Sequence, residues 1–314
     1  KPLYRKVPGV RIPPSPPVAV NYRLPPPLIM PAKIISAHEL ERQSRDGSVK
    51  IFDCRFALND PDAGRAAYEG SHIPGAVYVD LEKDLSGPIT PETGRHPLPD
   101  FPAWRNKLLR LGIDSDSTVV LYDGGPGVFA ARFWWMLGWA GIPNVMLLDG
   151  GFAEWCRQEL PLETEEHVAA MITPSADRVS DTESAGHVDA DFLMAGLGAP
   201  DPLVLDAREP ERFSGLKEPL DKKAGCIPGA VNRHFALNLS EGRFKTPESL
   251  REEFASLLKK RSPETVVHSC GSGVTACHNL FAMELAGLSG SRLYPGSWSE
   301  WITDPDRPIE VREG

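Results

Sequence analysis

The segment of residues 270–276, with the sequence CGSGVTA, carries the strongest indication of chemistry in the chain. It follows an apolar run, residues 265–269, that is typical of a buried strand, and it precedes a helical pattern that begins near Ala276. Two glycines in such a strand-to-helix turn let successive backbone N–H groups point at one place, and the helix dipole adds positive potential there. We therefore expect Cys270 to be held as a reactive thiolate.

Two enzyme chemistries place a thiolate in a loop of this kind. A cysteine phosphatase needs an arginine six residues after the cysteine to clamp the phosphate, and this chain has Ala276 there. A sulfur-transfer enzyme needs a nucleophilic cysteine and donors that stabilise a persulfide anion, without an arginine in the loop. The pattern favours sulfur transfer at Cys270. The substrate-facing loop residues are then Gly271, Gly273, Val274 and Thr275.

Four segments occur twice in the chain, in the same order, which indicates two copies of one domain. The pairs are VKIFDCR (49–55) with PLVLDAR (202–208), HIPGA (72–76) with CIPGA (226–230), TVVLYDGG (118–125) with TVVHSCGS (265–272), and LLDGGFAEW (147–155) with LYPGSWSEW (293–301). We expect domains at residues 33–160 and 190–308, joined by a polar linker at 161–189. The first copy keeps the loop glycines at 123–127 but has no cysteine, so the second copy is the predicted catalytic domain.

Short apolar runs alternate with helical patterns in each copy, for example a run at Val204-Leu205 and a helical stretch over residues 247–260. This alternation predicts an α/β protein in which each domain has a mainly parallel sheet flanked by helices. Residues 1–32 differ from the rest because they are rich in proline and basic residues. We expect them to form an extended arm.

Composition excludes several classes of protein. No run approaches the roughly 18 apolar residues of a membrane-spanning helix. The net charge of −9 weighs against a nucleic-acid-binding protein, which needs a basic surface. Five cysteines are an odd number at low density, so no disulfide framework is expected. These features favour a reducing compartment such as the cytoplasm, with the mitochondrion as an alternative.

The tandem HIPGA-type motifs, the DAR sequence at a strand end and the CGSGVTA loop resemble the two-domain rhodanese superfamily over residues 33–308. The loop is similar to that of 3-mercaptopyruvate sulfurtransferases, whereas thiosulfate sulfurtransferases have basic residues there, as in CRKGVTA. The resemblance implies that Cys270 takes sulfur from 3-mercaptopyruvate as a persulfide, releases pyruvate, and passes the sulfur to a thiol such as thioredoxin or glutathione, or to cyanide. It implies no cofactor and no metal.

The resemblance also implies cations for the carboxylate of the donor. Arg212 matches the family's carboxylate-binding arginine that follows the DAR sequence. Arg208 is open to two interpretations, a contact with substrate or an ion pair within the domain. The family's second arginine is absent from the segment KEPLDKK at 217–223, where Lys222 or Lys223 offers a point charge instead.

The family is credited with an Asp–His–Ser relay beside the cysteine. By resemblance its serine is Ser272 and its histidine is His72, and the acid is Asp62, with Asp60 as a competitor. Because His72 belongs to the first copy, the site is expected between the two domains.

Two alternatives remain beside the mercaptopyruvate reaction. One is thiosulfate:cyanide sulfurtransfer at the same cysteine. The other is a noncatalytic tandem rhodanese module that binds a partner, against which the intact Cys270 loop argues. The remaining cysteines are interpreted as structural, although Cys277, seven residues after Cys270, has the spacing of a resolving thiol.

Overall fold

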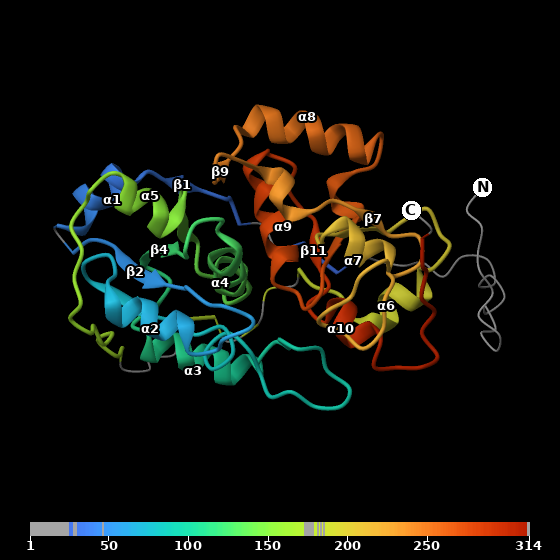
Figure 1. Ribbon diagram of the computed structural model, residues 1–314, viewed down its shortest axis with the longest axis horizontal. Coiled ribbons are helices and arrows are strands. Elements are labelled where there is room, and N and C mark those ends of the chain that lie inside the picture. The colour runs from blue at the N-terminus through green and yellow to red at the C-terminus, as the bar shows by residue number, and fades with distance from the viewer. Residues whose placement is uncertain are drawn as a thin grey trace.

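The computed structural model describes residues 25–312 apart from 28–29, 46, 173–178, 181, 183 and 185. Two α/β domains lie side by side (Figure 1). Most of the expected N-terminal arm, residues 1–24, lies outside the described residues. At the described end of the arm, the Pro25 carbonyl accepts a hydrogen bond of 2.6 Å from Arg292 Nε in the second domain.

The first domain has a parallel sheet with the strand order β1-β5-β4-β2-β3. Its strands are β1 (Ile34–Ile35), β2 (Lys50–Asp53), β3 (Ala76–Tyr78), β4 (Thr118–Tyr122) and β5 (Asn144–Leu148), and its helices are α1 (Ala37–Ser44), α2 (Ala63–Gly70), α3 (Phe101–Arg110), α4 (Val128–Trp139) and α5 (Gly151–Arg157). In β4, Val119 and Leu121 pack with α3 and α4, whereas Val120 and Tyr122 pack with α1 and α5. Burial of both faces explains the continuous apolar run in this strand.

The second domain has a smaller parallel sheet with the order β11-β10-β6-β7 and a separate antiparallel hairpin, β8-β9. Its strands are β6 (Leu203–Asp206), β7 (Val231–Asn232), β8 (Leu239–Ser240), β9 (Arg243–Phe244), β10 (Val266–Ser269) and β11 (Arg292–Leu293). Its helices are α6 (Ala190–Ala195), α7 (Pro210–Ser214), α8 (Pro247–Leu258), α9 (Thr275–Leu285) and α10 (Ser297–Trp301), with 3-10 turns η1 (Phe235–Asn238) and η2 (Pro263–Thr265). The predicted fold class is confirmed.

Helices α4 and α9 form the junction between the domains (Figure 1). The ring of Trp134 in α4 meets the ring of Phe281 in α9 edge-on, with centroids 4.9 Å apart. A single buried cluster contains apolar residues of both domains. Since α4 is apolar around its circumference except for Arg132, it needs cover from a second domain as well as from its own sheet. Each helix follows one of the two glycine-containing loops, so the junction brings these loops together.

The segment of residues 80–100, which we call the crossing loop, connects β3 to α3 and reaches the second domain. It is the long loop that extends below α10 in Figure 1. The Arg95 backbone N–H donates a hydrogen bond of 3.1 Å to Ser299 Oγ in α10. The Glu92 carbonyl accepts one of 3.3 Å from Thr303 Oγ1. The first domain therefore places part of its chain against α10 of the second domain.

None of the described helices has the length and apolar character needed to cross a bilayer.

Candidate active site

The cysteine loop, residues 270–274, holds the sulfur of Cys270 against its own backbone. Cys270 is 2 % exposed, and the Gly273 N–H donates to its Sγ over 3.1 Å. Gly273 has a φ of +77°, and a Cβ at this position would lie 2.3 Å from the Pro295 carbonyl oxygen, so only glycine fits. No side chain caps the N-terminus of α9, so the first N–H groups of the helix are not used by a capping residue.

Residues 296–299 fix the cysteine loop from the other side. The Trp298 and Ser299 N–H groups donate to the carbonyls of Cys270 and Gly271 over 3.0 and 2.9 Å. Ser297 has a φ of +53°, a left-handed conformation that costs a non-glycine residue about 1–2 kcal/mol. Its Oγ accepts a 3.0 Å bond from the Cys270 N–H and lies 4.0 Å from the Cys270 Sγ. The sequence interpretation did not single out Ser297.

Ser272 is paired with a histidine, but the partner is His96 and not His72. The distance between Ser272 Oγ and His96 Nδ1 is 2.8 Å. Burial, with smaller contributions from the neighbouring cations Arg132 and Arg95, lowers the pKa of His96 to about 3. The imidazole therefore stays neutral near pH 7. His96 lies in the crossing loop, so the expectation of a site between the domains holds through a different residue.

The structure does not bring His72 or Asp62 to the cysteine loop. Both ring nitrogens of His72 face carbonyls, Tyr68 O at 2.7 Å and Glu165 O at 3.0 Å. The backbone of His72 pairs with Glu163, as that of Cys226 pairs with Glu310 in the second domain. Asp62 is exposed at the start of α2. The relay assigned to His72 and Asp62 is wrong because the imidazole has a structural place at the end of the first domain.

His72, Glu163 and His167 are a group of described side chains that could hold a metal ion. Their ligand atoms lie within 4.8 Å of one another. However, both ring nitrogens of His72 lie within hydrogen-bond distance of main-chain carbonyls. A metal ion bound to His72 would therefore have to replace one of these two contacts.

Arg208 forms an ion pair within its own domain, which is one of the two roles considered for it. Its Nη2 lies 2.8 Å from Asp206 Oδ2 and donates to the Gly225 carbonyl over 2.8 Å. In the first domain, Arg55 makes the same pair of contacts with Asp53 and the Ser71 carbonyl. Because the copy without a cysteine keeps this arrangement, the arginine is not specific to catalysis.

Arg212 and Arg95 flank Gly271, the residue that follows the nucleophile. A Cβ at Gly271 would lie 3.5 Å from Arg212 Nη1 and Nη2 and 2.8 Å from Arg95 Nη2. Arg212 also forms ion pairs with Glu218 at 2.8 Å and with Asp221 at 3.0 Å. Arg95 comes from the crossing loop and was not predicted. The loop glycine thus lies close to cations supplied by both domains.

Arg132 in α4 is a buried cation below the cysteine loop. It donates to the carbonyls of Gly273 and His96 over 3.4 and 3.2 Å, and no carboxylate among the described residues pairs with it. Burial lowers the pKa of Arg132, and the nearby Cys277 and Cys270 oppose that effect. An unpaired buried cation adds positive potential at the site, which favours anionic sulfur.

The other buried cysteines near the domain cores are kept as thiols. Burial raises the pKa of Cys277 to about 12, and its Sγ lies 3.2 Å from the Gly273 carbonyl. Burial likewise raises the pKa of Cys226 to about 12. A resolving role for Cys277 is therefore not supported.

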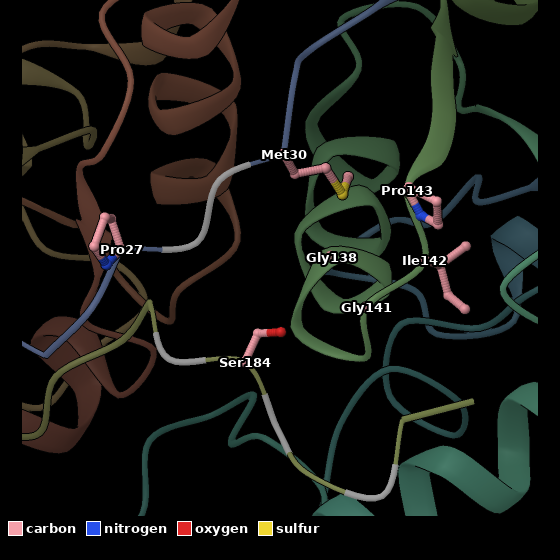
Figure 2. Close-up of a pocket in the computed structure, with 7 residues that line it drawn as sticks. All are labelled: Pro27, Met30, Gly138, Gly141, Ile142, Pro143 and Ser184. Atoms are coloured by element: carbon pink, nitrogen blue, oxygen red, sulfur yellow. The ribbon is translucent and has the colours of Figure 1, made fainter. Parts of the chain in front are cut away.

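A separate cavity of about 260 Å³ lies between the end of α4, the arm and the linker (Figure 2). Its lining carries no charged side chain and consists of Pro27, Met30, Gly138, Gly141, Ile142, Pro143 and Ser184. None of these residues belongs to the cysteine loop. Charged side chains lie instead beside Gly271 of the cysteine loop.

Comparison with known proteins gives concordant results. A family model described as "Rhodanese-like domain" matches residues 36–158 and 189–304. A protein of Pseudomonas aeruginosa named "Probable 3-mercaptopyruvate sulfurtransferase" is 49% identical, with 88% of this chain and 98% of the relative covered. SseB of Mycobacterium tuberculosis, which carries the name of a thiosulfate sulfurtransferase, is 38% identical over 88% and 96%. The crystal structure of SseA from Escherichia coli, titled as a 3-mercaptopyruvate sulfotransferase, superposes with a TM-score of 0.73 at 30% identity, covering 85% of this chain and 99% of that one.

Proposed function

The chain belongs to the rhodanese-like domain family and is a sulfurtransferase, and we propose that Cys270 carries the sulfur from 3-mercaptopyruvate to a thiol. The Cys270 thiolate attacks the sulfur atom of the donor, and the carbon–sulfur bond of the donor breaks. Pyruvate leaves as its enolate and takes up a proton, while a persulfide remains on Cys270. A thiolate acceptor then attacks the outer sulfur, and Cys270 leaves as the thiolate.

The observation that carries this proposal is the position of the Cys270 sulfur. It lies 3.1 Å from the Gly273 nitrogen, at the uncapped N-terminus of α9, with Arg212 beside the next residue of the loop. Such donors stabilise the negative charge of a thiolate and of a terminal persulfide sulfur. We assign Arg212 to the donor carboxylate and leave Arg208 to its ion pair with Asp206.

The Ser272–His96 pair has the place of the relay expected beside the nucleophile. We assign its hydroxyl to the keto oxygen of the donor, where negative charge develops as the enolate forms. Because His96 is neutral, it orients the Ser272 hydroxyl by a hydrogen bond and adds no charge. Val274 and Thr275 contribute backbone to the start of α9, beside the sulfur.

The acceptor is a thiol, and thioredoxin and glutathione are the acceptors that we propose. All five cysteines are free in the structure, which fits a reducing compartment such as the cytoplasm. Thiosulfate is the second candidate donor, since SseB carries the name of a thiosulfate sulfurtransferase. The cysteine loop itself has no basic residue in favour of that dianion.

The test is donor-dependent sulfur loading of Cys270. Wild-type protein treated with 3-mercaptopyruvate should gain one sulfur atom on the Cys270 peptide by mass spectrometry and should release pyruvate. Cys270→Ser should abolish both, because a serine hydroxyl is a poor nucleophile here and cannot form a persulfide. Cys277→Ser is the matched control and should keep the activity. Sulfur found only on Cys277 or Cys226 would contradict the assignment, and a higher kcat/KM for thiosulfate would favour the second donor.

A further inference from the structure

We propose that His72, Glu163 and His167 form a zinc site that holds the start of the linker against the first domain. The inference does not depend on the chemistry at Cys270. Glu163 and His167 belong to the linker, between the two segments that match the rhodanese-like family model. Two of the three ligands therefore lie outside the repeated domain.

The three side chains meet where the linker returns to the end of α2. His72 follows α2, and its backbone pairs with that of Glu163 through hydrogen bonds of 2.9 and 3.0 Å. The His167 N–H donates to the hydroxyl of Tyr68, a residue of α2, over 3.1 Å. These bonds hold the two imidazoles and the carboxylate in one place, with ligand atoms within 4.8 Å of one another.

The hydrogen bonds of the buried His72 prepare its Nε2 as a ligand. A neutral imidazole has one N–H and one lone pair. The shorter contact, 2.7 Å from Nδ1 to the Tyr68 carbonyl, takes the N–H. The Nε2 lone pair then faces the Glu165 carbonyl oxygen at 3.0 Å and Glu163 Oε1 at 3.5 Å. Metal-bound histidines donate their other ring N–H to a carbonyl or carboxylate in the same way.

His167 presents a second imidazole nitrogen to the same carboxylate. Its Nε2 lies 2.7 Å from Glu163 Oε1, yet it is buried and makes no hydrogen bond with any described atom. Tetrahedral zinc, with bonds of about 2.0–2.2 Å, holds its ligand atoms about 3.3 Å apart. The distances from Glu163 Oε1 to the two imidazoles, 2.7 and 3.5 Å, lie on either side of that value. The His167 side chain is 38 % exposed, so its ring has room to turn towards an ion.

The equivalent carboxylate of the second domain already has a cation. Glu310 has the place of Glu163 there, and it accepts a hydrogen bond of 2.9 Å from the Gly229 N–H. Arg312 Nε lies 2.9 Å from Glu310 Oε1. In the first domain the Gly75 N–H donates to Glu163 in the same way, but among the described residues only histidines pair with this carboxylate. An ion bound to the two histidines supplies the positive charge that the arginine supplies in the second domain.

The donor set selects the class of metal ion. Two imidazole nitrogens and one carboxylate suit zinc, whereas magnesium and calcium take oxygen ligands. The Glu165 carbonyl oxygen or a water molecule completes four ligands. An ion held only by the folded chain also stabilises it. Zinc, and not magnesium, should therefore raise the melting temperature.

The experiment is calorimetric titration of the full chain with zinc near neutral pH, with thermal unfolding in zinc and in magnesium as the second readout. All variants carry Cys270→Ser, which removes the nucleophilic thiol as a competing zinc ligand. His167→Asn removes one imidazole, and Glu163→Gln removes the charge but keeps an oxygen for the Gly75 N–H. His38→Asn, at an exposed histidine of α1, is the matched control.

We expect one zinc ion per chain in the Cys270→Ser background. His167→Asn and Glu163→Gln should each raise the Kd for zinc by about 100-fold or more, since even a contact outside the ligand set is worth 10- to 100-fold. The rise in melting temperature with zinc should disappear in both variants. His38→Asn should leave the Kd and the rise unchanged.

Absence of zinc binding would overturn the site, and a proton on His72 Nε2 would then be the source of the positive charge. An unchanged Kd in His167→Asn would place the ion elsewhere and would overturn the proposal as well. If His167→Asn without zinc melts far below the background, Glu163→Gln decides by the same ratio of Kd values. None of these results bears on the Cys270 persulfide, which the sulfur-loading experiment tests separately.

Discussion

The first domain contains a second copy of the loop, in which Asp123 stands where the catalytic domain has Cys270. The buried Asp123 carboxylate accepts hydrogen bonds from the N–H groups of Gly125, Gly127 and Phe129 at 3.0, 2.9 and 2.9 Å. Burial raises the pKa of Asp123, and these backbone bonds oppose the rise. This loop is thus filled by a carboxyl group that belongs to the chain.

The cysteine loop has the same strand, turn and helix but no carboxyl group. Its sulfur takes one N–H bond, from Gly273, and the start of α9 has no capping side chain. In the aspartate loop, residues 123–127, the Asp123 carboxylate occupies the N–H groups at the start of α4. The comparison teaches that activity depends on leaving these donors available for a sulfur anion that forms during the reaction.

The two loops also support each other across the junction. Arg132 of α4 donates to the Gly273 carbonyl of the cysteine loop at 3.4 Å. His278 of α9 lies 2.8 Å from the Pro126 carbonyl of the aspartate loop, and burial lowers the pKa of this imidazole to about 4. A neutral His278 with its proton on Nε2 donates this bond. The inactive copy is therefore a part of the site.

The largest effect should come from making the two loops alike. Cys270→Asp should remove all persulfide formation, because a carboxylate would occupy the donors as in the first domain. The melting temperature should stay near that of the wild type, since the equivalent loop of the first domain already accommodates a carboxyl group at Asp123. Pyruvate release and thermal unfolding measure the two outcomes.

The reciprocal change sharpens the same comparison. Adding Asp123→Cys to the Cys270→Asp variant should not restore turnover, because Arg95 and Arg212 lie beside the cysteine loop and Ser272 belongs to it. Donor-dependent sulfur on the introduced cysteine, together with pyruvate release, would show that the glycine loop alone is sufficient.

A smaller effect is expected at Ser297, whose counterpart Gly151 has a similar φ of +56°. Ser297→Ala and Ser297→Gly both remove the hydroxyl that accepts from the Cys270 N–H. Each should lower kcat/KM about 10-fold, the scale for losing one buried hydrogen bond. Glycine also relieves the backbone strain, so Ser297→Gly should be about 1–2 kcal/mol more stable to urea than Ser297→Ala. Equal stabilities would mean that the strain is absent.

The last prediction concerns pH and the neutral histidines. Burial lowers the pKa of His96 and of His268 to about 3, and that of His278 to about 4. An unfolded histidine titrates near 6.5, so below that pH the unfolded chain binds protons that the folded chain does not. Stability should therefore fall as the pH drops from 6.5 towards 4, by up to about 1.4 kcal/mol per pH unit for each histidine. Urea midpoints between pH 7 and 5 measure this.

The rate should show no such dependence near pH 6.5, because His96 remains neutral at the site. His96→Asn is the control for both measurements and should reduce the slope of stability against pH. A change of kcat/KM with pH that is centred near pH 6.5 and disappears in His96→Asn would contradict the conclusion that His96 is neutral.

Local patterns in the sequence were sufficient for the repeat, the parallel sheets and the cysteine loop. They were sufficient because each motif that indicates these features is a short run of consecutive residues. His96 and Arg95 could not be found in this way, because they reach the site through a loop that is longer in the first copy than in the second. His72 was assigned by its resemblance to the family's relay histidine, yet its ring serves main-chain carbonyls of its own domain and linker.

The shared burial of α4 and α9 has a consequence for unfolding. Neither helix keeps its apolar surface covered if the other domain melts, because one core contains residues of both. Loss of either domain would also remove one carbonyl partner that crosses the junction, Gly273 O for Arg132 and Pro126 O for His278. The chain should consequently lose its structure in one cooperative transition, so that the calorimetric and van't Hoff enthalpies agree for a protein with two sheets. A substitution in the core of the first domain then lowers the population of competent cysteine loops as much as one in the second.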